Sequence, residues 1–325
     1  MKTYNWAILG CGRIAKKFAT DLQLLPNAIL YAAASRQLKK AEDFVLQFGF
    51  KKAYGSYKEM VDDQKVHIVY IATPHSFHLN HALLCLNAKK AVLCEKAFAI
   101  NQREVLQMIT AAKKNKTFLM EAFWTRFNPA FLKVLEIIAS KELGELKQVK
   151  CDFKFFAAFD SQHRIFKNSL GGGSLLDIGI YPVFTALMTL GKPDNILLDV
   201  ELGKTGVDEN IEILFKYNNG NSANLASGFK YNAFNDSDFY FTKGSVRISR
   251  ELHRPLLIGE KGSIREIYFD RQKGLGYEKE AEHVMQCLDQ GLMESPLLPL
   301  DFSLDLINTL DRIRKKAKIY YPSHD

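Results

Sequence analysis

The stretch that decides the fold is NWAILGCGRIA, residues 5–15. It starts as an apolar run typical of a buried strand and continues at once into a glycine-rich hexapeptide. That hexapeptide has the pattern G-x-G-x-x-A: Gly10, Cys11, Gly12, Arg13, Ile14 and Ala15. The pattern alone is weak evidence, but here it follows a strand and opens a helix, which is the context in which such a loop binds the phosphates of a dinucleotide.

Each position of this loop has a physical reason. Gly10 permits the tight turn, Gly12 lets the backbone approach a pyrophosphate, and Ala15 keeps the helix close to the strand. The start of the helix supplies free N–H groups and a favourable dipole for phosphate oxygens. The competing interpretation is a simple tight turn that binds nothing.

The alternation of strand and helix continues to about residue 122. Strand-like runs lie at 5–10, 28–35, 67–73, 90–96 and 117–123, and helical patterns lie between them at 13–24, 37–48, 56–63, 77–88 and 101–115. The strand-like runs are continuously apolar, as a parallel sheet covered on both faces requires. We therefore predict an α/β fold whose first domain, residues 1–122, is a doubly wound Rossmann sheet that binds NADP.

After residue 123 the pattern changes. It predicts a helix at 129–140, a strand at 147–155, a helix from the glycines 171–173 to about 190, short alternating strands over 195–270, and a last helix at 300–317. This is typical of an α+β domain with a large, mostly antiparallel open sheet. We assign residues 123–325 to a domain for substrate binding and dimerisation, and the last helix could pack back on the first domain.

Composition limits the class of protein. A chain of 325 residues with 47% apolar and 25% charged residues suits a soluble protein of two domains. We find no signal peptide and no membrane span, and the five cysteines have no C-x-x-C spacing, so we expect a cytoplasmic protein with reduced thiols. The net charge of +8 is scattered, which a phosphate-bearing ligand explains as well as nucleic acid does; we predict no nucleic-acid partner.

The end of the second strand bears on the choice of cofactor. An NAD-selective site places Asp or Glu there to accept a hydrogen bond from the ribose 2′-OH. This chain has Ser35 and Arg36, with no acid before Glu42. Ser35 can donate to a 2′-phosphate and Arg36 can pair with it, so we predict NADP, with NAD as the weaker possibility. Alternatively, Arg36 is only a solvated residue at a helix start.

Ligands of open α/β sheets bind outside the carboxyl ends of the strands, and two such ends carry polar groups. One is Thr73-Pro74-His75, which leads to His78, and the other is Glu95-Lys96. We expect both to flank the nicotinamide half of the cofactor. No carboxylate or cysteine accompanies the histidines at ligand spacing, so we predict no metal site.

These motifs together resemble a known family. ATPHSFHLNHALLCLNAKKAVLCEKAFAI (72–100), EAFWTRFNP (121–129) and GGGSLLDIGIYPV (171–183) are similar to the glucose–fructose oxidoreductase/inositol dehydrogenase (Gfo/Idh/MocA) family. Within it, the likeness is greatest to the trans-1,2-dihydrodiol (D-xylose) dehydrogenases. The similarity runs from the glycine loop to residues 280–304.

The resemblance implies roles for particular residues. It implies a lysine that contacts substrate near the nicotinamide, here Lys96 with Glu95 as its neighbour, and a D-x-x-x-Y segment, here Asp177 to Tyr181. It also implies that His78 lies near the cofactor or Lys96, and that the open sheet forms a homodimer. The family has proline where this chain has Ala97. Because a cis bond is rare before other residues, we expect a trans Lys96–Ala97 bond, with a cis bond held by its surroundings as the alternative.

The predicted chemistry follows from these groups. Oxidising a hydroxyl needs a base for its proton while hydride leaves to nicotinamide. A nearby ammonium favours the phenolate form of a tyrosine, so Lys96 and Tyr181 form a plausible proton-transfer couple. Asp177, four residues before Tyr181, would orient a substrate hydroxyl or the lysine. Alternatively, Lys96 is itself the acid/base and Tyr181 only packs.

We therefore expect hydride transfer between a sugar, polyol or cyclic diol and the cofactor; the alternative is a non-catalytic NADP-binding regulator. The residues expected to contact the cofactor are Gly10, Cys11, Gly12, Arg13, Ile14, Ser35, Arg36, Thr73, Pro74, His75, His78, Glu95 and Lys96. Those expected to contact substrate are Trp124, Arg126, Phe155, Asp177 and Tyr181. For the aromatic residues, packing between the domains is the alternative. His163 and Arg164, on the long loop before the glycines, could reach the active site as a lid.

Overall fold

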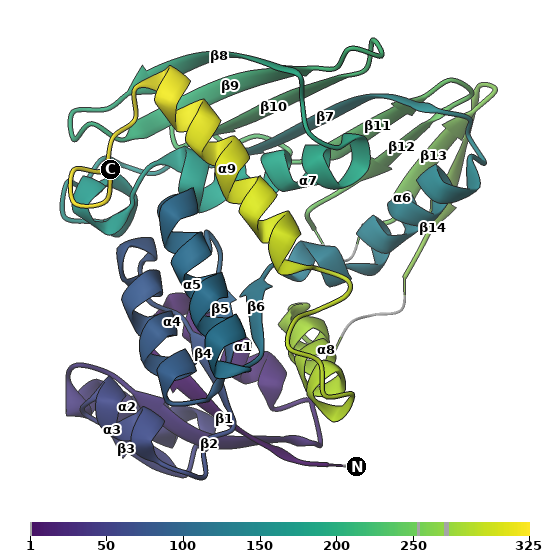
Figure 1. The fold of residues 1–325 in the computed structure, drawn as a ribbon. Helices are drawn as coiled ribbons and strands as arrows, with labels where there is room; N and C mark the ends of the chain where they lie inside the picture. Colours follow the sequence, from purple (N-terminus) through teal and green to yellow (C-terminus); the bar gives the residue numbers. More distant parts are fainter. Residues whose placement is uncertain (1, 252–253, 270–272) are drawn as a thin grey trace. The chain divides into compact units, whose positions relative to one another are not determined.

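The computed structural model describes residues 2–251, 254–269 and 273–325. The chain forms two compact units, each with its own sheet (Figure 1). The first unit comprises residues 1–127 and 272–304, and the second comprises 128–271 and 305–325.

The first unit contains a six-stranded parallel sheet with the order β3-β2-β1-β4-β5-β6. Its strands are β1 (Tyr4–Leu9), β2 (Ala28–Ala34), β3 (Lys52–Tyr54), β4 (Ile68–Ile71), β5 (Ala91–Glu95) and β6 (Leu119–Ala122). Its helices are α1 (Arg13–Leu22), α2 (Leu38–Phe48), α3 (Tyr57–Asp62), α4 (His78–Asn87), α5 (Gln102–Asn115) and α8 (Tyr277–Asp289), with short turns η1 (His75–Phe77) and η2 (Trp124–Phe127). The predicted doubly wound sheet is confirmed.

The second unit contains an eight-stranded sheet with the order β14-β13-β12-β11-β7-β10-β9-β8. Among the described residues, β7 pairs with β10 in parallel, and the other neighbouring strands of this sheet pair antiparallel. Its strands are β7 (Leu146–Lys154), β8 (Asn195–Leu202), β9 (Asp208–Lys216), β10 (Ser222–Gly228), β11 (Ser237–Phe241), β12 (Ser245–Ile248), β13 (Leu256–Glu260) and β14 (Ser263–Ile267). The mostly antiparallel open sheet is therefore confirmed.

The helices of the second unit precede the sheet or pack on it. They are α6 (Pro129–Ser140), η3 (Arg164–Phe166), η4 (Asn168–Leu170), η5 (Leu175–Gly179), α7 (Ile180–Leu190) and most of α9 (Leu300–Ala317). Asn128 caps α6 by accepting from the Ala130 amide at 2.8 Å, and Pro129 occupies the first helical position, where no N–H is needed. These local signals explain why the helix predicted at 129–140 begins at residue 129.

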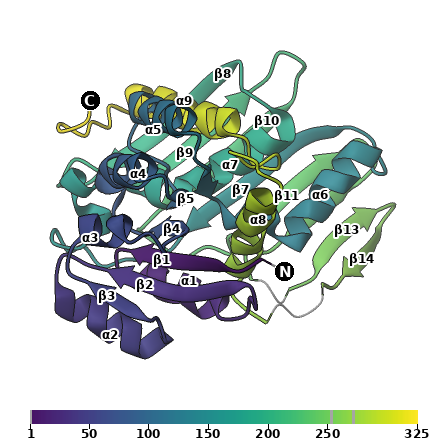
Figure 2. The same ribbon diagram turned by 60° about the horizontal axis from the view of Figure 1, so that its bottom comes forward.

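The compact units differ from the predicted domains because of α8, a helix that the strand and helix patterns did not predict. Its apolar residues Ala281, Val284, Met285 and Cys287 are buried in the same hydrophobic core as residues of β1, β4 and α1. Figure 2 shows α8 beside α1. The second stretch of the first unit is therefore part of its core, and the first stretch of this compact unit ends at residue 127.

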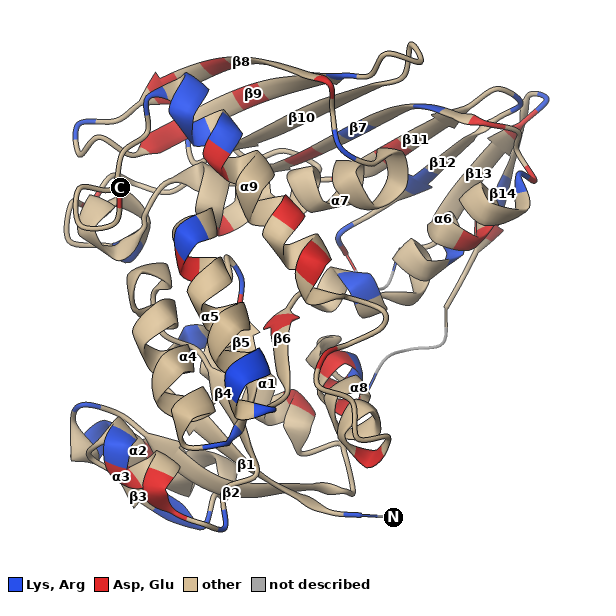
Figure 3. Ribbon diagram, in the orientation of Figure 1, with Lys and Arg blue, Asp and Glu red and all other residues tan. Residues whose placement is uncertain are grey.

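One segment, Asn168–Leu190, is long and apolar enough to cross a membrane by length and composition alone. Within the structure 83% of its most apolar window is buried, which is typical of a core helix. Lys and Arg are interleaved with Asp and Glu on the elements of both units (Figure 3).

Candidate active site

The glycine loop joins β1 to α1. Gly10 has φ +98°, and a Cβ there would lie 2.9 Å from Cγ2 of Thr73 and 3.2 Å from the Ala72 carbonyl oxygen. Only glycine suits this conformation and this close approach. The N-cap of α1 is Gly12, and within the described chain no side chain caps the helix and no acid lies in its first turn. The loop therefore fits the phosphates of a dinucleotide.

Three further residues of this loop were predicted to contact the cofactor. Arg13 is exposed, whereas Ile14 is half-buried and packs against the core. The Cys11 thiol lies 3.5 Å from the Ala34 carbonyl oxygen. Burial raises the pKa of Cys11 to about 11, so the thiol is neutral and does not repel a phosphate.

The end of β2 carries the two residues predicted to select NADP. Ser35 is buried, and its hydroxyl accepts a hydrogen bond from the Gln37 amide at 3.4 Å. Arg36 is exposed, and its guanidinium carbon lies 5.7 Å from the centre of the Phe77 ring. Both residues therefore stand at the carboxyl edge of the sheet.

His78 ties together the loops that follow β4 and β5. Its ring nitrogens lie 2.8 Å from the Ala97 carbonyl oxygen and 2.7 Å from that of Thr73, and the side chain is fully buried. Burial lowers the pKa of His78, and its hydrogen bonds to the two carbonyls oppose that shift. His75, also buried, packs edge-on against it at 5.7 Å. Pro74 precedes this turn in an extended conformation.

The loop after β5 carries Glu95 and Lys96. Glu95 is buried and accepts a hydrogen bond from the Tyr70 hydroxyl, while Lys96 is half-buried. The Lys96–Ala97 peptide is cis, so the expectation of a trans bond is wrong. Buried side chains hold both polar groups of the peptide that follows Ala97: the Ala97 carbonyl lies against His78, and the Phe98 amide donates to Oε1 of Glu121 at 3.1 Å. These contacts orient the lysine-bearing loop without the proline of the family.

In the second unit, Asp177 and Tyr181 lie on consecutive turns. Asp177 belongs to η5, a π-helical turn, and Tyr181 is the second residue of α7. Asp177 is buried and accepts a hydrogen bond from Nη2 of Arg164 at 2.7 Å. The Arg250 guanidinium carbon lies 4.3 Å from the centre of the Tyr181 ring and 3.6 Å from that of Phe153.

An arginine therefore contacts each of the two predicted catalytic side chains of this unit. Arg164 was predicted only as part of a lid, and Arg250 was not predicted at all. Arg250 lies 69 residues beyond Tyr181 in the chain (250 minus 181), so no local pattern links them.

The triple-glycine loop sets the start of this turn. A Cβ on Gly172 would lie 2.8–2.9 Å from three carbonyl oxygens of residues 164–167, which brings the loop that carries Arg164 against the glycines. The Tyr321 hydroxyl donates to the Gly172 carbonyl at 2.6 Å. The path of the backbone before Asp177 is therefore fixed by groups distant in the sequence.

Asp208, the first residue of β9, holds the same turn from the other side. Its Oδ2 accepts from the Leu175 amide at 2.6 Å and from the Ser174 hydroxyl at 2.7 Å, and the residue is fully buried. A Cβ on Gly173 would lie 2.3 Å from its Oδ1. Burial raises the pKa of Asp208 to about 7, although both hydrogen bonds oppose that rise.

Residues 4–123 match the oxidoreductase family described as having an NAD-binding Rossmann fold, and residues 131–247 match the GFO/IDH/MocA C-terminal domain. The chain belongs to the Gfo/Idh/MocA family. It is 36% identical to trans-1,2-dihydrobenzene-1,2-diol dehydrogenase of Mus musculus and 35% identical to that of Homo sapiens, over 98% of each chain in both comparisons.

Solved structures show the same fold. An aldose-aldose oxidoreductase from Caulobacter crescentus has a TM-score of 0.89 at 24% identity, covering 98% of each chain. A 3-ketoreductase from Actinomadura kijaniata, solved with NADP, has a TM-score of 0.86 at 22% identity over 97% of this chain and 98% of the other. A levoglucosan dehydrogenase solved with NADH has a TM-score of 0.89 at 20% identity over 98% and 97%.

Within this family member, the predicted substrate residues are divided between the units. Trp124 and Arg126 lie on η2 of the first unit, where the Trp124 ring is 6.2 Å from that of Tyr277 and Arg126 Nε donates to the Leu297 carbonyl at 2.8 Å. Phe155 follows β7 in the second unit and its ring is 5.1 Å from that of Phe229. Lys96 belongs to the first unit and Tyr181 to the second. Their proton-transfer couple stays a prediction.

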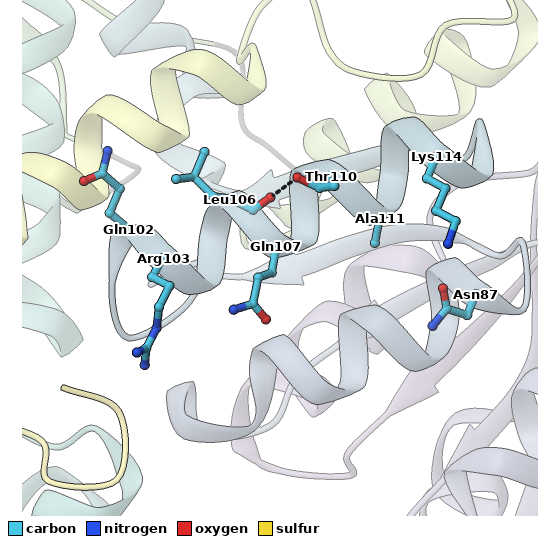
Figure 4. Close-up of a pocket in the computed structure, with 8 residues that line it drawn as sticks. All are labelled: Asn87, Gln102, Arg103, Leu106, Gln107, Thr110, Ala111 and Lys114. Atoms are coloured by element: carbon cyan, nitrogen blue, oxygen red, sulfur yellow. Dashed lines mark hydrogen bonds between the residues drawn. The ribbon is translucent and has the colours of Figure 1, made fainter.

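A surface hollow along α5 contains none of the predicted site residues. Figure 4 shows the side chains that line it: Asn87, Gln102, Arg103, Leu106, Gln107, Thr110, Ala111 and Lys114. These are mostly polar and flexible, and all but Asn87 belong to α5. The hollow is therefore separate from the candidate active site.

Proposed function

We propose that this protein is an NADP-dependent dehydrogenase that transfers hydride between the nicotinamide and a hydroxyl of a sugar, polyol or cyclic diol. The observation that carries the proposal is the Asp177–Tyr181 turn, in which each side chain meets an arginine, in a chain whose other unit has a dinucleotide loop. Family membership and the names of the dihydrobenzenediol dehydrogenases that it resembles support the reaction class.

Tyr181, Lys96 and Asp177 would each have a separate role in the reaction. When bound, the nicotinamide accepts or returns hydride. Tyr181 would hold the hydroxyl proton of the substrate, and Lys96 would stabilise the phenolate. Asp177 would accept a hydrogen bond from a neighbouring hydroxyl, with its carboxylate held in place by Arg164. In the alternative assignment, Lys96 itself takes the proton.

A substrate screen tests the reaction. Purified protein is mixed with NADP or NAD and with pentoses, hexoses, inositols or trans-dihydrodiols, and the absorbance of the reduced cofactor is followed. We expect turnover with at least one class and a preference for NADP. Measurable NADP binding without any turnover would instead favour the non-catalytic regulator.

Two substitutions test the chemistry. Tyr181→Phe and Lys96→Met should each lower kcat by about 10²–10⁴-fold, the usual contribution of acid–base groups, while NADPH affinity stays near the wild-type value. Tyr240→Phe is the matched control, because Tyr240 is an exposed tyrosine on β11 whose hydroxyl lies 3.5 Å from Asp238. Near wild-type activity of Tyr181→Phe would remove Tyr181 as the acid/base.

A third substitution tests the cofactor. Arg36→Asp replaces a donor for the 2′-phosphate with a carboxylate that repels it and that suits the 2′-OH of NAD. We expect the ratio of kcat/KM for NADP to that for NAD to fall by about 100-fold or more, equivalent to about 2.7 kcal/mol. An unchanged ratio would show that Arg36 does not select the cofactor.

We also propose a cytoplasmic homodimer that forms through the eight-stranded sheet. All five cysteines are free thiols, which suits a reducing compartment. One face of the sheet has a shallow hollow lined by residues of β7, β8, β9 and β10, and Leu197 at its margin is 44% exposed. Leu197→Glu should convert dimer to monomer in light scattering, whereas Leu46→Glu, at an 86% exposed position on α2, should not. A monomeric wild type would refute this proposal.

A further inference from the structure

Four side chains form a row of contacts beside the glycine loop, and only the first was predicted to bind cofactor. The Arg36 guanidinium carbon lies 5.7 Å from the centre of the Phe77 ring. The Phe77 ring stacks on that of His81 at 5.8 Å with an angle of 23° between the planes. His81 in turn meets the edge of Tyr57 at 4.8 Å and 75°. The four residues come from the end of β2, η1, α4 and α3.

His81, the third residue of this row, contacts a residue that borders the glycine loop. Nδ1 of His81 lies 3.0 Å from Oγ1 of Thr73, whose methyl group is the nearest neighbour of a Cβ built on Gly10. Burial, and then the neighbouring His78 and Arg36, lower the pKa of His81 to about 4. The ring is therefore neutral at physiological pH and adds no charge beside Arg36. Phe77 thus stands between a fixed, neutral ring and an exposed cation.

The contact between Phe77 and Arg36 limits how freely the Arg36 side chain rotates before a ligand binds. A freely rotating arginine loses rotamer entropy worth about 2 kcal/mol when a ligand fixes it. A cation–π contact at an exposed site contributes about 0.5–1 kcal/mol and uses none of the five N–H donors, which stay available to a phosphate. The contact with Phe77 therefore restricts Arg36 in advance without occupying its hydrogen-bonding groups.

We propose that Phe77, supported by His81, is a positioning residue that holds Arg36 for the 2′-phosphate of NADP and so contributes to the preference for NADP over NAD. The inference rests on the proposed NADP-dependent function and names an additional residue for its selectivity. NAD has a hydroxyl in place of that phosphate. Its binding should therefore be insensitive to the position of Arg36.

The test is a double-mutant cycle read by cofactor binding rather than by turnover. Dissociation constants of NADPH and NADH are measured by fluorescence titration for the full-length wild type, Phe77→Leu, Arg36→Leu and the double variant. We expect Phe77→Leu to weaken NADPH about three- to fivefold and to leave NADH within about twofold. In the Arg36→Leu background, Phe77→Leu should have no further effect on NADPH. Phe77→Tyr keeps the ring and should bind NADPH as the wild type does.

The outcomes separate this inference from the proposed function. If Phe77→Leu weakens NADH as much as NADPH, or still weakens NADPH when Arg36 is leucine, Phe77 only supports the fold and the inference is wrong. The effect of Arg36→Leu would then still support NADP selectivity. If Arg36→Leu itself leaves the ratio of the two constants unchanged, the proposed cofactor preference fails, and the inference fails with it. Unchanged NADH binding serves as the check that each variant is folded.

Discussion

Gly173→Ala is the sharpest test of how the turn that carries Asp177 is held. Gly173 has φ +111°, and a Cβ on it would lie 2.3 Å from Oδ1 of Asp208 and 3.4 Å from the Tyr321 hydroxyl. Asp208 cannot swing aside cheaply, because its other oxygen holds the Leu175 amide at 2.6 Å and the residue is fully buried. The substitution therefore forces either the glycine loop or Asp208 to move.

The expected cost has two parts. Placing alanine at a positive φ costs about 1–2 kcal/mol. Displacing a buried carboxylate from a backbone N–H costs about 1.5–3 kcal/mol more. The total is about 2.5–5 kcal/mol. The matched control is Gly220→Ala in the β9–β10 turn, where φ is +84° and a new Cβ meets nothing within 4 Å, so only the backbone cost of about 1–2 kcal/mol applies.

Urea unfolding followed by circular dichroism measures the difference between the two variants. We also expect kcat of Gly173→Ala to fall at least about tenfold, because a misplaced catalytic group is costly. NADPH affinity should be kept in both variants, since the dinucleotide loop at residues 10–15 belongs to the first unit. Equal destabilisation by the two substitutions would refute the close packing of Gly173 on Asp208.

Further predictions concern single contacts described above. Gly10→Ala should abolish detectable NADPH binding, because the new Cβ would collide with Thr73 after β4 and push the loop away. Gly49→Ala is the control: a Cβ there meets nothing within 4 Å, so NADPH binding should be unchanged in the same titration. Because the pKa of Asp208 is raised to about 7, the folded protein binds one more proton than the unfolded chain between about pH 4 and 7. The free energy of unfolding should therefore fall as pH rises through this range, by up to ~1.4 kcal/mol per pH unit. Asp208→Asn should flatten that slope when unfolding is measured at several pH values. Asn101 caps α5 by accepting from the Glu104 amide at 3.0 Å, so Asn101→Ala should lower the free energy of unfolding by about 1 kcal/mol, and no measurable loss would mean that the cap is not needed.

Local patterns in the sequence were sufficient for most of the fold. The strands of the first unit are short apolar runs that alternate with helical patterns, so this alternation located β1, β2, β4, β5 and β6 within a few residues. The edge strand β3 was missed because it has only three residues, one of them exposed. The helix α8 was missed because its core partners, on β1, β4 and α1, lie more than 200 residues earlier in the chain.

In the candidate site, too, contacts between residues distant in the sequence could not be predicted. Lys96, Asp177 and Tyr181 could be named from motifs, because each motif is local. The side chains that hold them could not. His78 of α4 contacts the Ala97 carbonyl in the loop after β5. Arg250, which follows β12, contacts the Tyr181 ring although 69 residues separate them in the chain. Such partners depend on which loops the topology brings together, and a pattern of residue types does not specify that.

The two-part composition of the first unit has a consequence for protein engineering. In a chimera of two relatives, a single crossover after Phe127 would leave α8 of one parent against α1 of the other. The smallest exchangeable module is residues 1–127 together with 272–304, grafted as two fragments. A single-fragment graft should be less stable than either parent, while the two-fragment graft keeps all the residues of this hydrophobic core from one source.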